Sequence, residues 1–383
     1  MPDNPPMPST ASSHRTAPVT PRAAGAMVKA VARSFALSVQ ILPERVRWPV
    51  TLAYLLARAS DAVADSVELA PEAAPDAPSR APALEALRLA IAAAAQHRDP
   101  GPDLTPLDPI QQQIPLASER RLLDALPLWL NALHDLPAVD RQLIGQVCET
   151  ILSGQRLDVQ RFGVQAAHAV VALRTRQEVE DYTWRVAGCV GEFWGLICET
   201  HLPGWRQANL GVMISAGIRY GQGLQRLNML RDTAPDLAQG RCYWSEEELQ
   251  SVGLSAWQLA HMVQQADRRP LAVMAPLWSD WVAQTRAGLS LGVAYSVAIT
   301  PWRLRLASAL PALIGLRTLQ VLEKLGPAAL AEPIKVPRSW VYYLLLQLLL
   351  SGGTPSALRR IAQGLGATPQ QLSLPAPDGT MRP

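Results

Sequence analysis

Four polar side chains recur at helical spacing in a leucine- and alanine-rich segment near residue 60. They stand at positions i, i+4, i+7 and i+11 and are Tyr54, Arg58, Asp61 and Asp65. In an α-helix this spacing places all four on one face. Two carboxylates one turn apart repel each other, and burying such a pair costs free energy unless a cation lies beside it. We call Asp61 and Asp65 the first aspartate pair.

A second polar face occurs in the second half of the chain. Its members stand at i, i+3, i+7 and i+11 and are Gln225, Asn228, Asp232 and Asp236. Arg231 lies beside them, as Arg58 does in the first face. Pro235 predicts that the helix bends or ends before Asp236, because proline lacks the backbone N–H that continues a helix. We call Asp232 and Asp236 the second aspartate pair.

Two acidic faces on facing helices suit one kind of ligand. Mg²⁺ takes oxygen ligands, uses few protein carboxylates and fills its remaining positions with water and phosphate oxygens. Two aspartate pairs would hold a diphosphate through bridging Mg²⁺ ions, and the neighbouring arginines would neutralise a departing diphosphate. Each face alone is more often a solvated helix surface, and Arg58 with Asp61 also fits a simple i, i+3 ion pair. The spacing alone leaves both interpretations open.

The elements that must position these residues are predicted to be helices. Apolar residues recur at helical spacing between residues 27 and 69, in the stretch ALEALRLAIAAAA, and at 255–287, 303–325 and 338–350. No run alternates apolar and polar residues with β-branched enrichment, so no strand is predicted. We expect a disordered Pro-rich leader at 1–26 and an all-α domain at 27–350. A Pro/Ala-rich insertion falls at about 70–112, and a flexible tail covers 351–383.

Composition narrows the class of protein. The 383 residues are 49% hydrophobic and 17% charged, with a formal net charge of +3. Without a dense basic run this charge does not indicate nucleic-acid binding. Four cysteines without zinc-like spacing are typical of reduced, buried thiols, and the N-terminus lacks the apolar core of a secretory signal. We therefore expect a cytoplasmic protein. The apolar run at 340–350 is too short to span a bilayer, which favours a core helix and leaves contact with a membrane surface open.

Three motifs in this order resemble the squalene and phytoene synthase family. They are ARSFALSVQILPERVRWPVTLAYLLARASDAVAD, DYTWRVAGCVGEFWG and GQGLQRLNMLRDTAPDLAQGRCYW, and the resemblance runs from about residue 27 to about 346. It implies a single-domain isoprenoid synthase fold, with antiparallel helices around a central apolar cavity. It also implies head-to-head condensation of two allylic prenyl diphosphates with Mg²⁺.

The resemblance assigns roles to particular positions. The two aspartate pairs match the two aspartate-rich motifs of the family, with Asn228 and Gln225 leading into the second. The remaining matches are Arg33 and Ser34 in a basic element, Arg58 ahead of the first motif, Tyr182 near the reacting carbons, and Lys335 and Arg338 in a late basic segment near the cofactor or diphosphate. Relatives often carry further acidic residues where this chain has Ala64, Ser66 and Pro235. Those departures predict weaker metal binding or an altered geometry.

Several assignments come from the residue types within these motifs. Tyr54 and Tyr182 are candidates for stabilising a carbocation through their aromatic faces, although each also fits a cavity wall. Arg241 fits a contact with diphosphate or cofactor, and equally a surface ion pair. Gly188, Gly191 and Gly195 share one helix face, which indicates close helix packing or room for a prenyl chain.

The expected reaction joins two farnesyl diphosphates through presqualene diphosphate to squalene, with NADPH as hydride donor. The stretch AYLLARASDAVAD is closer to the squalene synthase version of the first motif, which is why we favour this product. A phytoene or dehydrosqualene synthase, without a hydride step, and a presqualene diphosphate synthase are the alternatives. A non-catalytic helical lipid-binding or assembly protein is an alternative of another class. We expect a monomer that contacts membranes peripherally, if at all.

Overall fold

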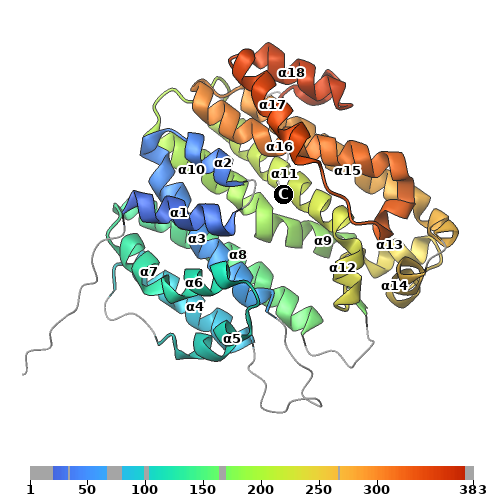
Figure 1. The fold of residues 1–383 in the computed structure, drawn as a ribbon, viewed down its shortest axis with the longest axis horizontal. Helices are drawn as coiled ribbons and strands as arrows, with labels where there is room; N and C mark the ends of the chain where they lie inside the picture. The colour runs from blue at the N-terminus through green and yellow to red at the C-terminus, as the bar shows by residue number, and fades with distance from the viewer. Residues whose placement is uncertain are drawn as a thin grey trace, which may run out of the picture.

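A computed structural model describes residues 20–32, 35–66, 80–98, 103–163, 170–265 and 268–375 of the chain, and most of its described residues are helical (Figure 1). The all-α prediction is therefore confirmed. The helices of the N-terminal half are α1 (Pro21–Val31), α2 (Phe35–Ile41), α3 (Glu44–Ala64), α4 (Arg80–Ala95), α5 (Asp108–Gln113), α6 (Ala117–Asp124), α7 (Leu126–His134) and α8 (Ala138–Phe162).

The C-terminal half contains the longest apolar helices. Its helices are α9 (Arg176–Thr183), α10 (Cys189–His201), α11 (Leu210–Arg231), α12 (Thr233–Ala238), α13 (Glu246–Ser251), α14 (Ala256–Gln264), α15 (Ala275–Val297), α16 (Trp302–Leu325), α17 (Arg338–Leu350) and α18 (Pro355–Gly364). A π-helical turn, Trp184–Gly188, joins α9 to α10. Short 3₁₀ helices cover Thr105–Leu107, Arg269–Met274, Gly326–Ala331 and Gln370–Leu372.

Two short strands escaped the prediction from sequence. β1 (Val171–Ala172) and β2 (Arg241–Cys242) pair in parallel and have two residues each. Strands this short leave no alternating pattern in a sequence, so only the fold reveals them. Their importance is local, because β2 holds Arg241 beside the cavity described below.

Four helices of the C-terminal half pack in antiparallel succession, and glycines set their spacing. A side-chain carbon added at Gly191 of α10 would lie 2.0 Å from the carbonyl oxygen of Gly217 on α11. A carbon added at Gly223 of α11 would lie 2.9 Å from Gly288 of α15. The predicted role of Gly191 in close helix packing is therefore confirmed. Residue pairing places α10, α11, α15 and α16 side by side with alternating direction.

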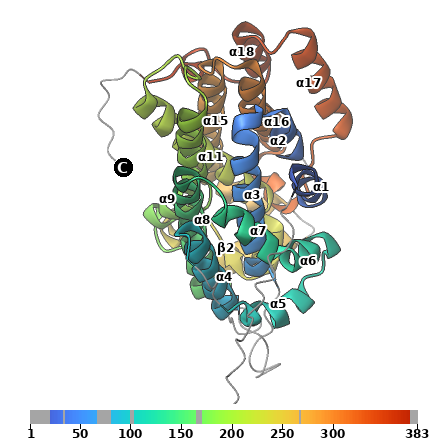
Figure 2. The ribbon, with the colours of Figure 1, turned by 90° about the vertical axis from the view of Figure 1, so that its left-hand side faces the viewer.

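The buried apolar side chains form two clusters that meet along α11, α15 and α16. The first is built mainly by helices of the N-terminal half and the second by those of the C-terminal half. Since three helices contribute to both clusters, the described chain is one packed unit (Figures 1 and 2). All four cysteines are buried free thiols, as the sequence predicts.

Both predicted flexible ends contain ordered helix. α1 begins at Pro21, where the Thr20 hydroxyl accepts a hydrogen bond from the Ala23 N–H, so the leader prediction is wrong for residues 21–26. α18 and the turn after it pack against the core through Leu358, Ala362 and Leu372, so the tail prediction is wrong for residues 355–372. In both segments a few apolar residues at helical spacing outweigh the polar composition.

One helical stretch of the described chain, Trp302–Ala331, is long and apolar enough to cross a membrane. Its most apolar window is 67% buried within the fold. A helix that packs its apolar surface against its own protein is a core helix by this criterion.

Candidate active site

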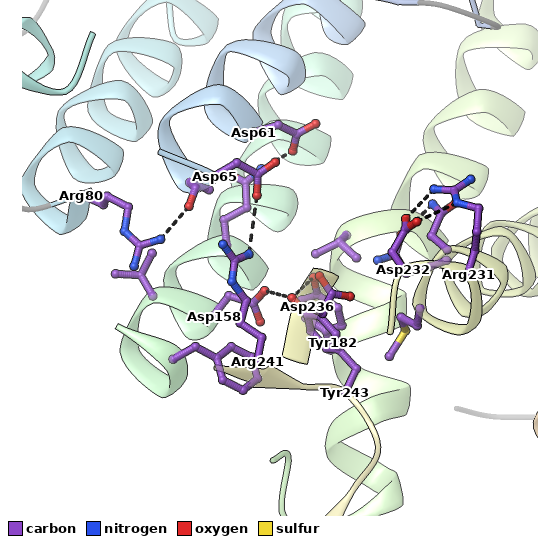
Figure 3. Close-up of a pocket in the computed structure, with 18 of the residues that line it drawn as sticks. Asp61, Asp65, Arg80, Asp158, Tyr182, Arg231, Asp232, Asp236, Arg241 and Tyr243 are labelled. Carbon is purple, nitrogen blue, oxygen red and sulfur yellow. Dashed lines mark hydrogen bonds and ion pairs between the residues drawn. The ribbon is translucent and has the colours of Figure 1, made fainter. Parts of the chain in front are cut away.

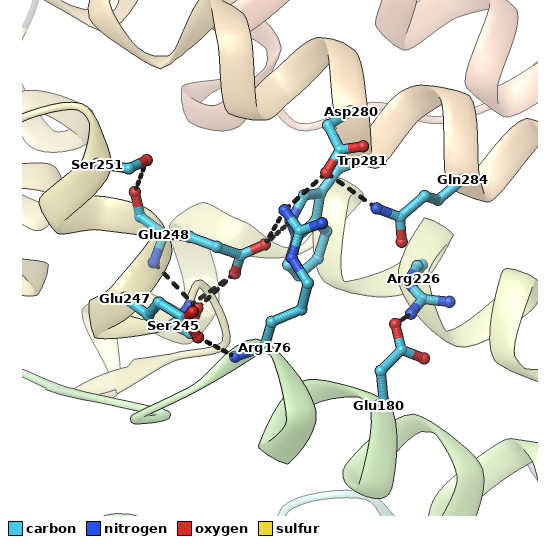
Figure 4. A network of polar contacts seen from close by, with 10 residues as sticks. All are labelled: Arg176, Glu180, Arg226, Ser245, Glu247, Glu248, Ser251, Asp280, Trp281 and Gln284. Atoms are coloured by element: carbon cyan, nitrogen blue, oxygen red, sulfur yellow. Dashed lines mark hydrogen bonds and ion pairs between the residues drawn. The ribbon is translucent and has the colours of Figure 1, made fainter. Parts of the chain in front are cut away.

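A polar cavity of about 410 Å³ opens where the ends of α3, α8, α9 and α11 converge (Figure 3). Both aspartate pairs line it, although they lie far apart in the sequence. The other predicted residues on its wall are Arg58, Tyr182, Gln225, Asn228, Arg231 and Arg241. The structure therefore brings most of the predicted site residues into one chamber.

The first aspartate pair lies at the C-terminal end of α3. Asp61 is in the last helical turns, and Asp65 is the C-cap, whose N–H donates to the Asp61 carbonyl. The carboxylate of Asp61 accepts a 2.6 Å hydrogen bond from the side-chain amide of Gln155 on α8. Its side chain is 45% exposed, and that exposed surface belongs to the cavity wall. α3 therefore presents its polar face to the chamber and its leucines to the core.

The second pair is divided between two helices. α11 ends at Arg231, Asp232 is its C-cap, and the six-residue helix α12 carries Asp236. The helix that carries Gln225 and Asn228 therefore ends before Asp236, as Pro235 predicts. Pro235 itself lies in the first turn of α12, where its missing N–H breaks no helical hydrogen bond. The N–H of Asp236 still donates to the Asp232 carbonyl, which keeps the two side chains one turn apart.

Arginines hold the carboxylates in pairs. Arg231 binds Asp232 through two nitrogens, and Arg241 lies 3.6 Å from an Asp65 oxygen. Arg58 lies 3.6 Å from Asp61 and also hydrogen-bonds the buried Glu119 of α6. Each of the three arginines forms an ion pair with an aspartate and also lines the cavity.

Arg241 connects the two sides of the chamber (Figure 3). Strand β2 positions it, and its side chain, only 15% exposed, reaches from the α12 side to Asp65 at the end of α3. Arg241 thus forms an ion pair at the chamber wall, and its contact with a diphosphate or cofactor stays a prediction.

Two stacked tyrosines and a buried carboxylate form the floor. The rings of Tyr182 and Tyr243 stack with centroids 5.0 Å apart, and their hydroxyls lie 3.3 Å apart. The Tyr243 hydroxyl donates to Asp158 of α8 at 2.6 Å. Tyr182 lies in the last turn of α9, two residues before the π-helical turn, an irregularity that is frequent at functional sites.

Burial and mutual repulsion change the titration of the acids. The pKa of Asp236 is raised to about 7, mainly by burial and also by the nearby carboxylates of Asp232, Asp158 and Asp65, while Arg241 opposes the increase. Burial also raises the pKa of Asp61 and that of Asp158 to about 6. The pKa values of Tyr182 and Tyr243 lie well above the usual value because burial disfavours the phenolate. The chamber therefore holds more negative charge than its surroundings stabilise.

The oxygen ligands of the chamber fit a hard cation whose remaining coordination positions are filled by water or substrate. Among the described residues no three His, Cys, Asp or Glu side chains lie close enough to hold a metal by themselves. Mg²⁺ commonly binds through one or two carboxylates and takes its other oxygens from water and phosphate. Two buried oxygens, Oδ1 of Asp158 and Oε1 of Gln155, have no hydrogen-bond donor among the described residues. Five aspartates and four arginines line the chamber, so a diphosphate entering alone would add unbalanced negative charge.

Two apolar pockets adjoin the polar chamber at Asn228. One, of about 220 Å³, lies between α10, α11, α15 and α16, and Gly191 and Trp194 line it. The other, of about 190 Å³, lies between α2, α11 and α16, and Val341 of α17 borders it. Asn228 belongs to the wall of all three spaces. A molecule with a charged head and apolar tails would match this combination.

Some predicted residues lie outside the chamber. Tyr54 does not line it, and its ring packs against Phe35 at 4.9 Å, where Phe35 borders both apolar pockets. Lys335 and Arg338 are exposed at the start of α17 and line none of the three spaces. Arg33 and Ser34 lie outside the described residues. The structure thus gives the assignment of Lys335 and Arg338 to a cofactor no support from position.

Four polar residues on the chamber wall had no predicted role. They are Arg80, Gln155, Asp158 and Tyr243. Gln155 and Asp158 stand at i, i+3 within SGQRLDVQRF, next to apolar core positions, and this is the same pattern that revealed the two aspartate pairs. Arg80 begins α4 and donates to the Ala64 carbonyl at the end of α3, and no motif marks it in the sequence.

The chain is similar in sequence to known proteins. The sequence profile described as squalene/phytoene synthase matches residues 28–340. The bifunctional lycopene cyclase/phytoene synthase of Colletotrichum graminicola is 27% identical over 240 residues, which cover 61% of this chain and 36% of that protein. The chain therefore spans about a third of the length of this curated relative.

Solved structures share the fold at low sequence identity. TcSQS with a bound ligand superposes with a TM-score of 0.69 at 19% identity, covering 92% of this chain and 90% of that one. A dehydrosqualene synthase with a bound ligand gives a TM-score of 0.55 at 19% identity, over 90% and 96% of the two chains. Squalene synthase HpnC from Alicyclobacillus acidocaldarius gives 0.55 at 18% identity, over 80% and 93%. The predicted isoprenoid synthase architecture is thereby confirmed as a fold.

Proposed function

The chain belongs to the squalene/phytoene synthase family, and from this premise we propose that it condenses two prenyl diphosphates head to head. One observation carries the proposal. Both aspartate pairs, four arginines and Tyr182 line a single polar chamber, and Asn228 of its wall also lines two apolar pockets. Two diphosphate heads would lie in the chamber and their apolar tails in the pockets.

The residues of the chamber suit loss of diphosphate from an allylic carbon. Arg58, Arg231 and Arg241 would bind the departing oxygens and stabilise the charge that develops on them. The two aspartate pairs and Asn228 would hold Mg²⁺. When bound, Mg²⁺ neutralises diphosphate charge as a Lewis acid. Because Arg231 and Arg241 already bind aspartates, binding of substrate requires these ion pairs to rearrange.

The remaining walls suit a reaction that passes through carbocations. The apolar pockets would exclude water that would otherwise quench a cation. The ring of Tyr182 would stabilise positive charge through its face. Because the pKa values of Tyr182 and Tyr243 are raised, both phenols stay neutral and are weak nucleophiles toward the cation. The second substrate's double bond attacks the first cation, and loss of a proton closes a cyclopropane ring.

We propose further that the sequence of reactions ends by proton loss, giving a phytoene- or dehydrosqualene-type triene. This replaces the expectation of squalene formed with NADPH. The curated relative named above includes a phytoene synthase. Lys335 and Arg338, the residues assigned to the cofactor or diphosphate, are exposed and do not line the chamber, so their position does not favour a hydride step.

Product analysis tests this proposal. Purified protein is incubated with farnesyl or geranylgeranyl diphosphate and Mg²⁺, with and without NADPH, and the extracted products are identified by mass spectrometry. We expect a head-to-head hydrocarbon whose formation does not depend on NADPH. Squalene formed only with NADPH would contradict the hydride-free ending, and presqualene diphosphate as the sole product would show that the second ionisation does not occur. Absence of any condensation product would overturn the assignment as a condensing enzyme.

A further inference from the structure

Helix α17 exposes a row of large apolar side chains. Tyr342, Tyr343, Leu346, Leu349 and Leu350 are between 53% and 80% exposed. Four of them stand at i, i+4, i+7 and i+8, so they share one side of the helix with the fifth beside them. We call these five residues the α17 apolar face.

The opposite side of the same helix is attached to the protein. Leu344 and Leu348 are buried, and Arg317 of α16 lies over the ring of Trp340. α17 therefore has apolar surface on both sides, only one of which the fold covers. In Figure 2 the helix stands at the edge of the molecule, outside the main body of helices.

An exposed tryptophan lies near the end of this helix. The carbonyl of Gly353, just after α17, accepts a hydrogen bond from Arg305 in the first turn of α16. That turn begins with Trp302, which is 55% exposed and carries Arg303 over its ring. Exposed apolar surface of this extent marks a binding surface for a protein or a membrane.

The charges of the chain segment that contains α17 favour one of these partners. Between Glu332 and Asp378 the sequence contains no acidic residue and four basic ones, which are Lys335, Arg338, Arg359 and Arg360. All four are exposed. Two copies of the chain joined through α17 would bring these cations together with no nearby acid from the same segment to pair with them. An anionic lipid surface offers the complementary charge.

The side chains also match a lipid surface. Tyrosine and tryptophan prefer the boundary between head groups and acyl chains, and leucines bury in the outer acyl region. The stretch from 1 to 19 has Met1, Met7 and Val19 as its only large apolar residues, so its sequence offers little to cover five such side chains.

We propose that the α17 apolar face docks on the surface of an anionic lipid bilayer, with the neighbouring basic residues at the head groups. Val341 of the same helix borders the apolar pocket that reaches Asn228 and Arg231. Docking by α17 places this pocket next to lipid. If the proposed function holds, on which this last step rests, an apolar product can pass from the pocket into the bilayer without crossing water.

The test is binding of the full-length protein to vesicles. Vesicles contain phosphatidylcholine with about one third phosphatidylglycerol, or phosphatidylcholine alone, and binding is measured by co-sedimentation. The variant Leu346→Ser/Leu349→Ser/Leu350→Ser removes apolar surface that does not support the core. Trp257→Ser is the matched control, because Trp257 is a 59% exposed aromatic on α14, distant from α17 in Figure 1.

We expect the wild type and the Trp257 variant to bind the anionic vesicles and the triple variant to bind at least about tenfold more weakly. Binding should fall with added salt and be weaker on neutral vesicles. Equal binding by the wild type and the triple variant would overturn the proposal. A concentration-dependent dimer that the triple variant lacks, with no vesicle binding by the wild type, would assign the face to a second copy of the chain.

Measuring turnover beside vesicle binding distinguishes membrane docking from the proposed condensation reaction. The triple variant should keep wild-type turnover in detergent micelles, since none of its residues lines the chamber or the pockets. Wild-type turnover without vesicle binding would refute docking alone. Vesicle binding without turnover would refute the proposed function and leave docking intact.

Discussion

Asp61 and Asp232 illustrate how each aspartate pair is held before any ligand arrives. Asp61 accepts a hydrogen bond from Gln155 and lies 3.6 Å from Arg58, which it shares with Glu119, whereas Asp232 is bound through both oxygens by Arg231. The charge of the first carboxylate is therefore less completely neutralised than that of the second. This asymmetry predicts that the two pairs contribute differently to stability while both contribute to turnover.

We expect Asp61→Asn and Asp232→Asn each to lower kcat/KM by about a hundredfold or more, because each removes charge that would bind the cation opposite a departing diphosphate. Asp61→Asn should leave the melting temperature of the ligand-free protein unchanged or higher, since burial already raises the pKa of Asp61. Steady-state kinetics and thermal denaturation measure the two effects. Asp135→Asn, at a side chain that is 68% exposed, is the control. Near-normal turnover in both variants would remove the aspartate pairs from the mechanism.

Asp158 should make the stability of the metal-free protein depend on pH. Its pKa is raised to about 6 in the folded protein, mainly by burial, against about 4 in the unfolded chain. Between these pH values the folded state therefore binds more protons than the unfolded state. The free energy of unfolding that this proton binding contributes is lost as pH rises from about 4 to about 6.

The isosteric variant Asp158→Asn does not titrate and isolates this effect. Relative to the variant, the wild type should lose melting temperature as pH rises through this window in the presence of a chelator. Thermal denaturation at several pH values measures the difference. A difference that is constant from pH 4 to pH 7 would show that the folded and unfolded pKa values are equal.

At the scale of elements, the site depends on how helix ends are brought together. α3 ends at Ala64, α11 ends at Arg231, and β2 directs Arg241 between them. The contact between α10 and α11 fixes this arrangement, because Gly191 and Gly217 let the two backbones touch. The apolar pocket beside Trp194 lies along the same pair of helices.

Gly191→Ala should therefore destabilise the protein strongly. Its methyl group would meet backbone atoms of Gly217 at 2.0 Å, and backbone cannot move aside as a flexible side chain can. We expect a loss of about 2 kcal/mol or more in the free energy of unfolding, measured by chemical denaturation. Gly25→Ala is the matched control, because no atom lies within 4 Å of the added carbon, and alanine favours the α1 helix. Equal effects of the two substitutions would contradict this packing.

The whole molecule combines a charged chamber with apolar pockets, and this combination separates an enzyme from a helical scaffold. An unreactive farnesyl diphosphate analogue with Mg²⁺ should raise the melting temperature, because a ligand that binds only the folded state stabilises it by mass action. Addition of a chelator should remove most of the shift, since the chamber has five aspartates and cannot accept the diphosphate charge without cations. A shift that persists without Mg²⁺ would refute the metal requirement. No shift at saturating analogue would favour a non-catalytic protein.

The sequence alone determined the local features of this molecule. Helical periodicity predicted the all-α class, and the i, i+3, i+4 and i+7 spacings predicted which residues share each polar face. Pro235 predicted that the helix ends before Asp236. These features depend on contacts within a few residues, which a linear pattern records.

Only the tertiary structure decided which of these residues act together. Asp158 and Tyr243 line the chamber because α8 and the segment that follows β2 approach from distant parts of the chain. Lys335 and Arg338 are exposed at the start of α17 and do not line it. The sequence also did not predict the exposure of the α17 apolar face, because an apolar run does not indicate which side of the resulting helix packs against the protein. Such outcomes depend on packing between distant segments, which spacing along the chain does not specify.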